Sequence, residues 1–216
     1  MEQFNAPIMN PNLARLQPYP FQKLAALLAG VTPDPSLRPI SLSIGEPKHP
    51  TPQFIRDALI DQIGGLSSYP ATAGSEALRN AMAGWIERRY QIARIDPARQ
   101  VLPVNGSREA LFAFAQAVVD GSRERPAAVA PNPFYQIYEG AILLAGAEPH
   151  FLNLLPDTGF ALDLRQFPEE VWSRTQLIYV CSPGNPTGNV ITLEEWRTLF
   201  DLSDRHGFVI AADECY

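Results

Sequence analysis

The sequence is poor in the residues that build metal sites and disulfides. Its 216 residues include two cysteines and three histidines. Cys181 and Cys215 lie in apolar stretches without CxxC spacing or neighbouring histidines, which is typical of free thiols in a protein core. The histidines are far apart in the sequence, so no metal-ligand pattern is present. We therefore expect two buried free thiols and no metal.

Long apolar runs, clustered charge and nucleotide-binding motifs are also missing. No apolar run approaches the length of a bilayer span, and the N-terminus resembles neither a signal peptide nor a transit peptide. The net charge of -6 has no basic cluster of the kind that nucleic-acid binding requires. Neither GxGxxG nor GxxxxGKS/T occurs, which excludes a Rossmann or P-loop nucleotide site. We expect a cytoplasmic protein that acts on small molecules, without a membrane or nucleic-acid partner.

What the sequence does contain, after Pro52, is an alternation of short apolar runs and amphipathic helical patterns. Its composition, 46% hydrophobic and 19% charged, is that of a globular protein. Such alternation is typical of βαβ units, and runs without strict alternation predict strands that are covered on both faces. The sequence therefore predicts an α/β fold, a mostly parallel sheet with helices on both faces. The predicted strands are Val101–Val104, Ala127–Ala130, Gln176–Cys181 and Phe208–Ala212.

Helix signals lie between these strands. Apolar residues with helical spacing predict one helix that begins near Ser107 and runs to Val118. Thr192 and Glu195 have the spacing of a capping box, and Gly207 stands where that helix should end.

The N-terminal quarter has a different character. It is rich in proline, with one helical pattern over Phe21–Ala29 and one apolar run over Ile40–Ile44 that predicts a short strand. We expect an arm and hinge segment over residues 1–50 and a sheet domain over residues 51–216.

Ligands of open parallel sheets bind beyond the carboxyl ends of the strands. After the first predicted strand, Gly106, Ser107 and Arg108 open a helix, and a helix N-terminus beside a glycine suits a phosphate. A serine in this place is also a common helix cap, and by itself the motif favours that simpler interpretation.

The next strand ends bring aromatic, amide and acidic side chains. Tyr135 is the candidate for stacking on a flat heterocycle, whereas Phe134 and Tyr138 are expected to pack in the core. A stiff loop over residues 181–188, in which an X-Pro bond could be cis, carries the amide of Asn185. Asp213 ends an apolar strand, where a carboxylate could hold a protonated ring nitrogen.

Four segments in this order, SIGEP, NGSREAL, SPGNPTG and DECY, resemble those of the fold-type I, class I and II aminotransferases over essentially the whole chain. The resemblance implies pyridoxal phosphate as the cofactor and an incomplete large domain preceded by an N-terminal arm. It implies that Gly106, Ser107 and Arg108 contact the cofactor phosphate and that Tyr135 stacks on the ring.

The same resemblance implies the remaining site residues. Asn185 and Tyr216 correspond to residues that hydrogen-bond the phenolic oxygen of the ring, and Asp213 to the residue that pairs with the ring nitrogen. Gly45 corresponds to a residue whose backbone meets the substrate carboxylate. Tyr69 corresponds to one that reaches the phosphate of the partner subunit's cofactor, which implies a homodimer.

Longer segments, including LPVNGSREALFAFAQAV and LSDRHGFVIAADECY, resemble the proteobacterial N-succinyldiaminopimelate aminotransferases of lysine biosynthesis. This resemblance implies glutamate as amino donor and N-succinyl-2-amino-6-oxopimelate as acceptor. Three alternatives stay open: another aminotransferase, a pyridoxal-phosphate-dependent C–S lyase, or a non-catalytic protein of the same fold.

Lysine is scarce, although pyridoxal-phosphate enzymes bind their cofactor covalently through a lysine. The two lysines are Lys23, predicted to face solvent far from every motif, and Lys48, which lies nearer the expected site. In the family the lysine follows the position of Tyr216. We therefore expect a truncated N-terminal part of an enzyme that is inactive alone, without its cofactor-binding lysine and carboxylate-binding arginine.

Overall fold

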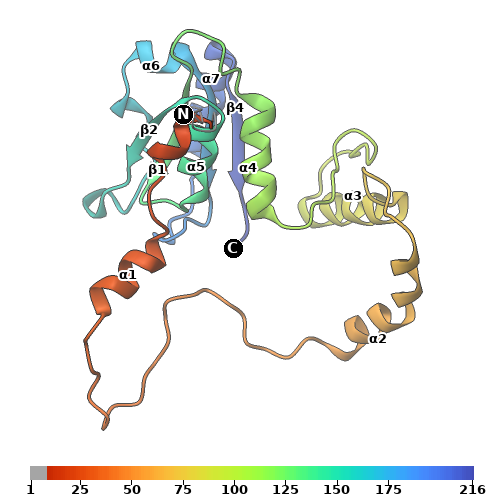
Figure 1. The fold of residues 1–216 in the computed structure, drawn as a ribbon. Coiled ribbons are helices and arrows are strands. Elements are labelled where there is room, and N and C mark those ends of the chain that lie inside the picture. Colours follow the sequence, from red (N-terminus) through yellow and green to blue (C-terminus); the bar gives the residue numbers. More distant parts are fainter. Residues whose placement is uncertain (1–8) are drawn as a thin grey trace, which may run out of the picture. The chain divides into compact units, whose positions relative to one another are not determined.

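The computed structural model describes residues 9–216, and its centre is a four-stranded sheet (Figure 1). The strand order is β2-β1-β3-β4, and every pairing between neighbours is parallel. In chain order the helices (α), 3-10 helices (η) and strands (β) are η1 Pro11–Arg15, α1 Pro20–Leu28, α2 Gln53–Asp61, η2 Ile63–Ser67, α3 Glu76–Tyr90, α4 Ser107–Val118, β1 Ala127–Asn132, α5 Ile137–Leu144, β2 Glu148–Asn153, η3 Pro156–Thr158, η4 Leu164–Gln166, α6 Glu169–Arg174, β3 Thr175–Cys181, α7 Leu193–His206 and β4 Val209–Asp213.

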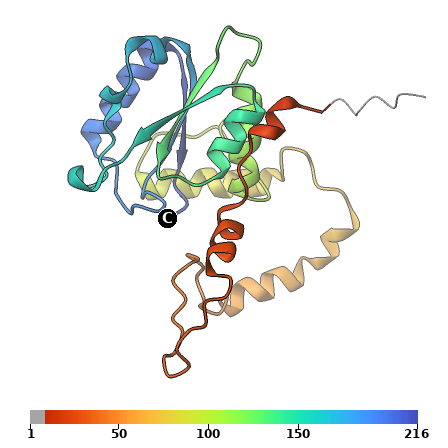
Figure 2. The same ribbon diagram turned by 60° about the vertical axis from the view of Figure 1, so that its left-hand side comes forward.

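Helices cover both faces of this sheet because the side chains of each strand alternate between the faces. Val129, Ile178 and Val180 pack with Trp172 of α6 and Leu199 of α7 in one buried cluster. Figure 2 shows α7 (blue) on the opposite side of the sheet from α4 and α5 (green). The predicted α/β class, with a parallel sheet between two helical layers, is confirmed.

The second buried cluster lies on the α4 and α5 side. It contains Leu177 and Tyr179 of β3, Ala115 of α4, and Tyr138 and Ile142 of α5. All five of these residues are fully buried. Two aromatic rings on this face bring hydroxyl groups into the core, where each needs a hydrogen-bond partner.

The predicted capping of α7 is present at both ends. The Thr192 hydroxyl accepts from the Glu195 N–H, and the Glu195 carboxylate accepts in return from the Thr192 N–H, as a capping box requires. At the other end Gly207 has φ 77° and donates its N–H to the Ser203 carbonyl at 2.8 Å. This left-handed conformation favours glycine, so the helix ends where the sequence indicated.

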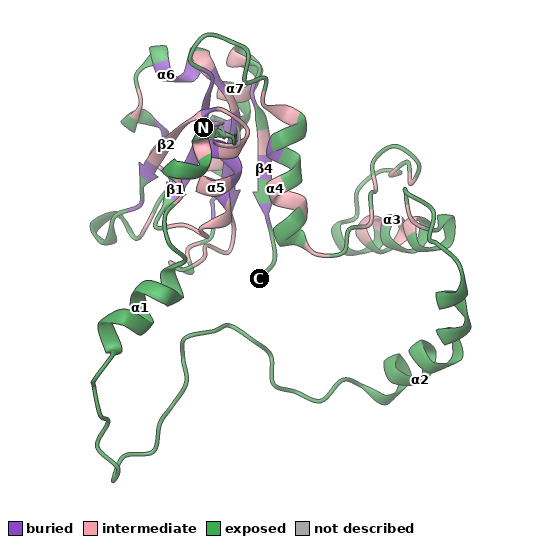
Figure 3. Ribbon diagram, viewed as in Figure 1, coloured by how far each residue is buried: buried purple, intermediate pink, exposed green. Residues whose placement is uncertain are grey.

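The chain forms two compact units. One contains residues up to Ala29 together with Asn105–Tyr216, and the other is Gly30–Val104. Figure 3 shows that burial is concentrated in the sheet and the helices against it, whereas every residue from 17 to 73 is exposed. The division at residue 50, expected from the sequence, stays a prediction.

Two predicted strands are wrong. Residues 101–104 and 40–44 are not strands, and their apolar side chains are open to solvent, with Leu42 89% and Leu102 65% exposed. An apolar run forms a strand only where a neighbouring strand offers hydrogen bonds, and Pro103 has no N–H to donate.

One strand was missed, namely β2. Its first three residues are Glu148, Pro149 and His150, and charged residues and proline are not typical of a buried strand. Because β2 lies at the edge of the sheet and pairs with β1 alone, a proline and polar side chains are tolerated there.

Across residues 9–216, none of the helices combines the length and the apolar character that crossing a membrane would require.

The capping carboxylate of Glu195 makes stability depend on pH. Burial raises the pKa of this carboxyl, but hydrogen bonds from Thr192 and from the Leu162 N–H outweigh it and hold the pKa below 4.5. Because the pKa of Glu195 is lower in the folded state than in the unfolded state, the ionised carboxylate stabilises the fold above about pH 4.5. This stabilisation is lost as the pH falls toward the folded-state pKa.

We expect Glu195→Gln to lower the free energy of unfolding by about 1 kcal/mol at pH 7, and by less below pH 4.5. Urea titrations followed by tryptophan fluorescence measure this difference. The matched control is Glu194→Gln, because Glu194 lies beside Glu195 in the first turn of α7. A loss that is equal at pH 7 and pH 4, or equal in both variants, would contradict the account.

Candidate functional site

Because the strands are parallel, the carboxyl ends of β1, β3 and β4 lie side by side along one edge of the sheet. This edge is the row of strand ends and is distinct from the edge strand β2. Cys181, the last residue of β3, is opposite Asp213, the last residue of β4. The Ser182 N–H then donates to the Asp213 carbonyl at 3.1 Å, so the loop after β3 starts beside the end of β4. Three of the predicted segments therefore begin at this edge.

The central group of the edge is the carboxylate of Asp213, which is 7% exposed. The hydroxyl of Tyr138 donates to its Oδ2 at 2.7 Å, and the Cys215 N–H donates to Oδ1 at 3.3 Å. A buried carboxylate is costly without such donors. Since a carboxylate has about four acceptor positions, two donors leave it able to bind a further cationic N–H.

Tyr138 is a functional residue that sequence reasoning missed. It was expected to pack in the core, and it does, but its hydroxyl is also the principal donor to Asp213. Burial, followed by the hydrogen bond to Asp213, raises the pKa of Tyr138 well above its ordinary value, so the hydroxyl stays protonated. The available signal was a tyrosine, not a phenylalanine, in a position predicted to be buried.

The ring of Tyr138 is itself held by a second tyrosine. It stacks on Tyr179 with ring centroids 4.7 Å apart and an angle of 11° between the planes. The Tyr179 hydroxyl donates to the Leu111 carbonyl of α4 at 2.7 Å. The donor to Asp213 is thus fixed by the same cluster that packs α4 and α5 on the sheet.

The N-terminus of α4 lies beside the same edge. Its N-cap is Gly106, no side chain caps the helix, and Ser107 is its first residue. The Ser107 hydroxyl is hydrogen-bonded to the Cys215 thiol at 3.2 Å, which ties the start of α4 to the chain after β4. The simpler interpretation of Ser107 as a helix cap is therefore wrong.

This helix start fits a phosphate. It offers uncapped backbone N–H groups, the Ser107 hydroxyl and the positive end of the helix dipole. A Cβ on Gly106 would lie 2.7 Å from Oε2 of Glu109, so the glycine provides the space that this carboxylate fills. An anion bound at the same place would have to displace the Glu109 carboxylate.

Tyr135 packs against Tyr138, the donor to the Asp213 carboxylate. Its ring meets that of Tyr138 edge to face, with centroids 6.0 Å apart. Burial raises the pKa of its hydroxyl, while nearby Arg108 lowers it and Asp213 raises it. The charges of the predicted phosphate residue Arg108 and the predicted ring-nitrogen residue Asp213 therefore both act on the Tyr135 hydroxyl.

The loop after β3 presents the amide of Asn185. The Ser182–Pro183 and Asn185–Pro186 bonds are both cis, and the Ile191 N–H donates to the Ser182 hydroxyl at 3.1 Å. Within residues 9–216, neither the Asn185 amide nor the Tyr216 hydroxyl makes a side-chain hydrogen bond. Both polar groups are thus available to a ligand.

Other predicted residues are not part of this cluster. Gly45 and Tyr69 belong to the unit Gly30–Val104, where Tyr69 is fully exposed, and their roles stay predictions. Cys181 is a buried free thiol as expected, but Cys215 is exposed, so that expectation is wrong for Cys215. Among the residues that the structure describes, no group of three or more metal-binding side chains converges.

Lys23 is exposed, as predicted, but contrary to the prediction it lies close to one of the motifs. It lines a cavity of about 410 Å³ together with Asn132, Phe134 and Glu139, residues from the end of β1 to the first turn of α5. The distance was predicted wrongly because no sequence pattern indicates that η1 packs on α5.

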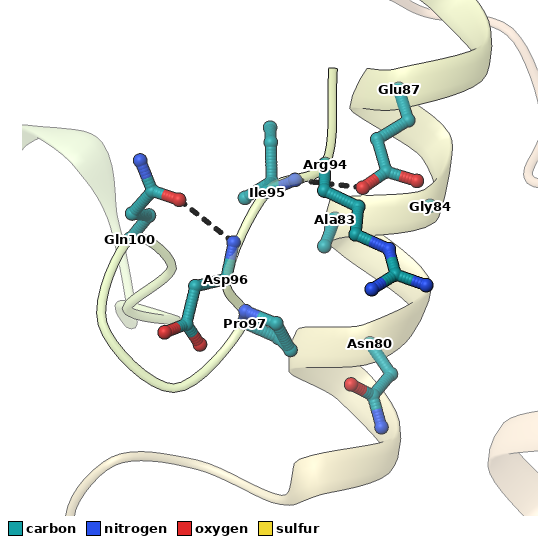
Figure 4. Close-up of a pocket in the computed structure, with 9 residues that line it drawn as sticks. All are labelled: Asn80, Ala83, Gly84, Glu87, Arg94, Ile95, Asp96, Pro97 and Gln100. Carbon is teal, nitrogen blue, oxygen red and sulfur yellow. Dashed lines mark hydrogen bonds between the residues drawn. The ribbon is translucent and has the colours of Figure 1, made fainter. Parts of the chain in front are cut away.

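A larger cavity, of about 520 Å³, lies within the unit Gly30–Val104 (Figure 4). Two of its polar side chains are hydrogen-bonded within the unit, since the Glu87 carboxylate accepts from the Ile95 N–H and the Gln100 side chain accepts from the Asp96 N–H, each at 2.7 Å. None of the predicted site residues lines it. Size alone therefore does not identify the functional site.

This chain resembles known aminotransferases in both sequence and structure. The chain matches the model of the family described as aminotransferase class I and II over residues 38–216. The LL-diaminopimelate aminotransferase of Desulforudis audaxviator is 32% identical over 206 residues, which is 94% of this chain and 51% of that protein. That of Nitratidesulfovibrio vulgaris is 34% identical over 206 residues, which is 94% of this chain and 52% of that protein.

Two solved structures have the same fold. An aminotransferase of Neisseria meningitidis superposes with a TM-score of 0.90 at 51% identity and covers 96% of this chain and 53% of its own. The aminotransferase AspB of Helicobacter pylori gives a TM-score of 0.84 at 38% identity, with coverages of 93% and 52%. The chain thus spans about half the length of the relatives it matches.

The hydrogen bond between Tyr138 and Asp213 predicts strong coupling between these residues. We expect Tyr138→Phe to lower the free energy of unfolding by about 1–3 kcal/mol, because it leaves a buried carboxylate short of its main donor. In a protein that already carries Asp213→Asn, Tyr138→Phe should lower the free energy of unfolding by less. Urea titrations of the two single variants and the double variant measure this coupling.

Tyr179→Phe is the matched control, since it removes a hydroxyl from the same stack that donates to the Leu111 carbonyl instead. Tyr179→Phe should lower the free energy of unfolding by the same amount in the parent protein and in Asp213→Asn. Additive effects of Tyr138→Phe and Asp213→Asn would show that the hydrogen bond does not support the carboxylate.

Proposed function

The chain belongs to the class I and II aminotransferases, and on this premise we propose that the protein is a pyridoxal-phosphate-dependent transaminase. The observation that carries the proposal is the buried carboxylate of Asp213 at the ligand-binding edge of a parallel sheet, with acceptor capacity to spare. Pyridoxal phosphate, when bound, supplies the electron sink that weakens the bonds at the Cα atom of an amino acid.

Asp213 would hold the ring nitrogen of the cofactor in its protonated, cationic form. An opposite charge at hydrogen-bonding distance favours that form, and the buried surroundings strengthen the pairing. Tyr138 supports this role because its neutral hydroxyl donates to one carboxylate oxygen and restricts the orientation of the group.

The start of α4 would bind the cofactor phosphate. The backbone N–H groups after Gly106, the Ser107 hydroxyl and the Arg108 guanidinium are the donors assigned to it. Tyr135, whose ring packs edge to face on that of Tyr138, would stack on the ring of the cofactor.

Asn185 and Tyr216 would orient the ring through its phenolic oxygen. The side chains of both residues make no hydrogen bonds with other described residues. With Asp213 they are the residues of this chain to which we assign catalytic roles. The lysine that binds the cofactor and the arginine that binds the substrate carboxylate are not assigned to this chain.

For the substrates we propose glutamate as amino donor and N-succinyl-2-amino-6-oxopimelate as acceptor. The succinylated acceptor is supported by the long segments that resemble N-succinyldiaminopimelate aminotransferases. The relatives named for LL-diaminopimelate support a diaminopimelate-type substrate but not its succinyl group. We further propose that Gly45 meets the substrate carboxylate and that the enzyme is a homodimer in which Tyr69 contacts the partner subunit's cofactor.

The function is tested by assaying amino transfer from glutamate in the complete protein that contains this chain. Transfer to N-succinyl-2-amino-6-oxopimelate is expected, and faster than to the acceptor without the succinyl group. Release of pyruvate and ammonia from a cysteine conjugate, without amino transfer, would instead identify a C–S lyase.

Asp213→Asn should lower kcat by about a hundredfold or more, because it removes the charge that stabilises the protonated ring nitrogen. Circular dichroism and the melting temperature should stay close to those of the parent protein. Asp120→Asn is the matched control, since Asp120 is an exposed residue that accepts from Ser122. Near-normal turnover of Asp213→Asn would remove Asp213 from this role.

A further inference from the structure

Residues 9–29 of the N-terminal arm belong to the sheet unit. The 3-10 helix η1 packs on α5, and a Cβ on Gly140 of α5 would lie 3.9 Å from Cδ2 of Leu16, at ordinary contact distance. Pro18 and Pro20 then restrict the backbone that leads into α1. The arm therefore has a defined path over α5.

Between this arm and the turn after β1 lies the cavity of about 410 Å³. Its size is within the range of small-molecule sites, which is roughly 300–1,000 Å³. Phe134 and Gln136, which line it, are the sequence neighbours of Tyr135, the residue assigned to the cofactor ring. Asn132, the last residue of β1, also lines the cavity, so the cavity lies at the carboxyl end of a sheet strand, where ligands of parallel sheets bind.

The charged groups in the cavity are free to bind such a ligand. Lys23 enters from α1 and Glu139 from α5, and within residues 9–216 neither forms an ion pair. The first turn of α1 contains no acidic residue that could neutralise Lys23. The amide side chains of Gln17, Asn132 and Gln136 complete the polar lining.

We infer that this cavity is the subsite for the far end of a long amino-acid substrate, and that Lys23 is the counter-ion of a distal carboxylate. The inference rests on the proposed transaminase function. Glu139 can accept from an N–H of the same substrate. A short amino donor such as glutamate would react without using Lys23, so Lys23 determines specificity and takes no part in the chemistry.

The test measures binding, not turnover, in the complete protein with its cofactor. The probes are α-methyl-2-aminopimelate, which has no Cα proton to lose, and its distal carboxamide. By calorimetry we expect Lys23→Gln to weaken binding of the carboxylate probe about fivefold to tenfold, and binding of the carboxamide less than twofold. Lys23→Arg should retain most of the affinity.

Arg15→Gln is the matched control, because it removes a positive charge from the same arm at a residue that does not line the cavity. Its affinity for both probes should be unchanged. An equal loss for both probes in Lys23→Gln, or no loss for either, would overturn the inference.

Failure of this inference can be told apart from failure of the proposed function. If amino transfer from glutamate persists while Lys23→Gln binds both probes normally, the proposed function stands and the subsite is wrong. If the parent protein transfers no amino group from any amino acid, the proposed function itself is wrong.

Discussion

The hydrogen bond from Tyr138 to Asp213 is the interaction on which the rest of the site depends. It connects the second helical layer with the end of β4 and satisfies a carboxylate that the fold buries. A buried charge without a partner destabilises a protein by several kcal/mol, about 3–5 when a partner is removed. The fold can therefore keep an acid at this edge only while α5 is correctly packed.

This dependence makes the site a product of the core. Tyr138 stacks on Tyr179 of the central strand β3, and the Tyr179 hydroxyl reaches the backbone of α4. The start of α4 in turn meets the end of β4 through Ser107 and Cys215. The proposed phosphate end and ring-nitrogen end of the site are thus positioned by one continuous set of contacts.

The sequence predicted those features that depend on local chemistry. The strands β1, β3 and β4 and the capped helix α7 follow from apolar runs and cap residues, although β4 is only partly buried, with Val209 39% exposed. Features that depend on distant partners were missed or predicted wrongly. Residues 101–104 have no strand to pair with, and β2 tolerates Pro149 because it is an edge strand. The hydroxyl of Tyr138 donates to Asp213, which is 75 residues away in the chain. Lys23 was misplaced for the same reason, since its neighbours come from α5.

The central claim is that Asp213 binds the ring nitrogen of the cofactor. It is tested most directly by comparing the affinity of the complete protein for pyridoxal phosphate with that for an analogue in which carbon replaces the ring nitrogen. The parent protein should bind the analogue at least about tenfold more weakly, and Asp213→Asn should discriminate far less between the two. Equal discrimination by both proteins would contradict the account.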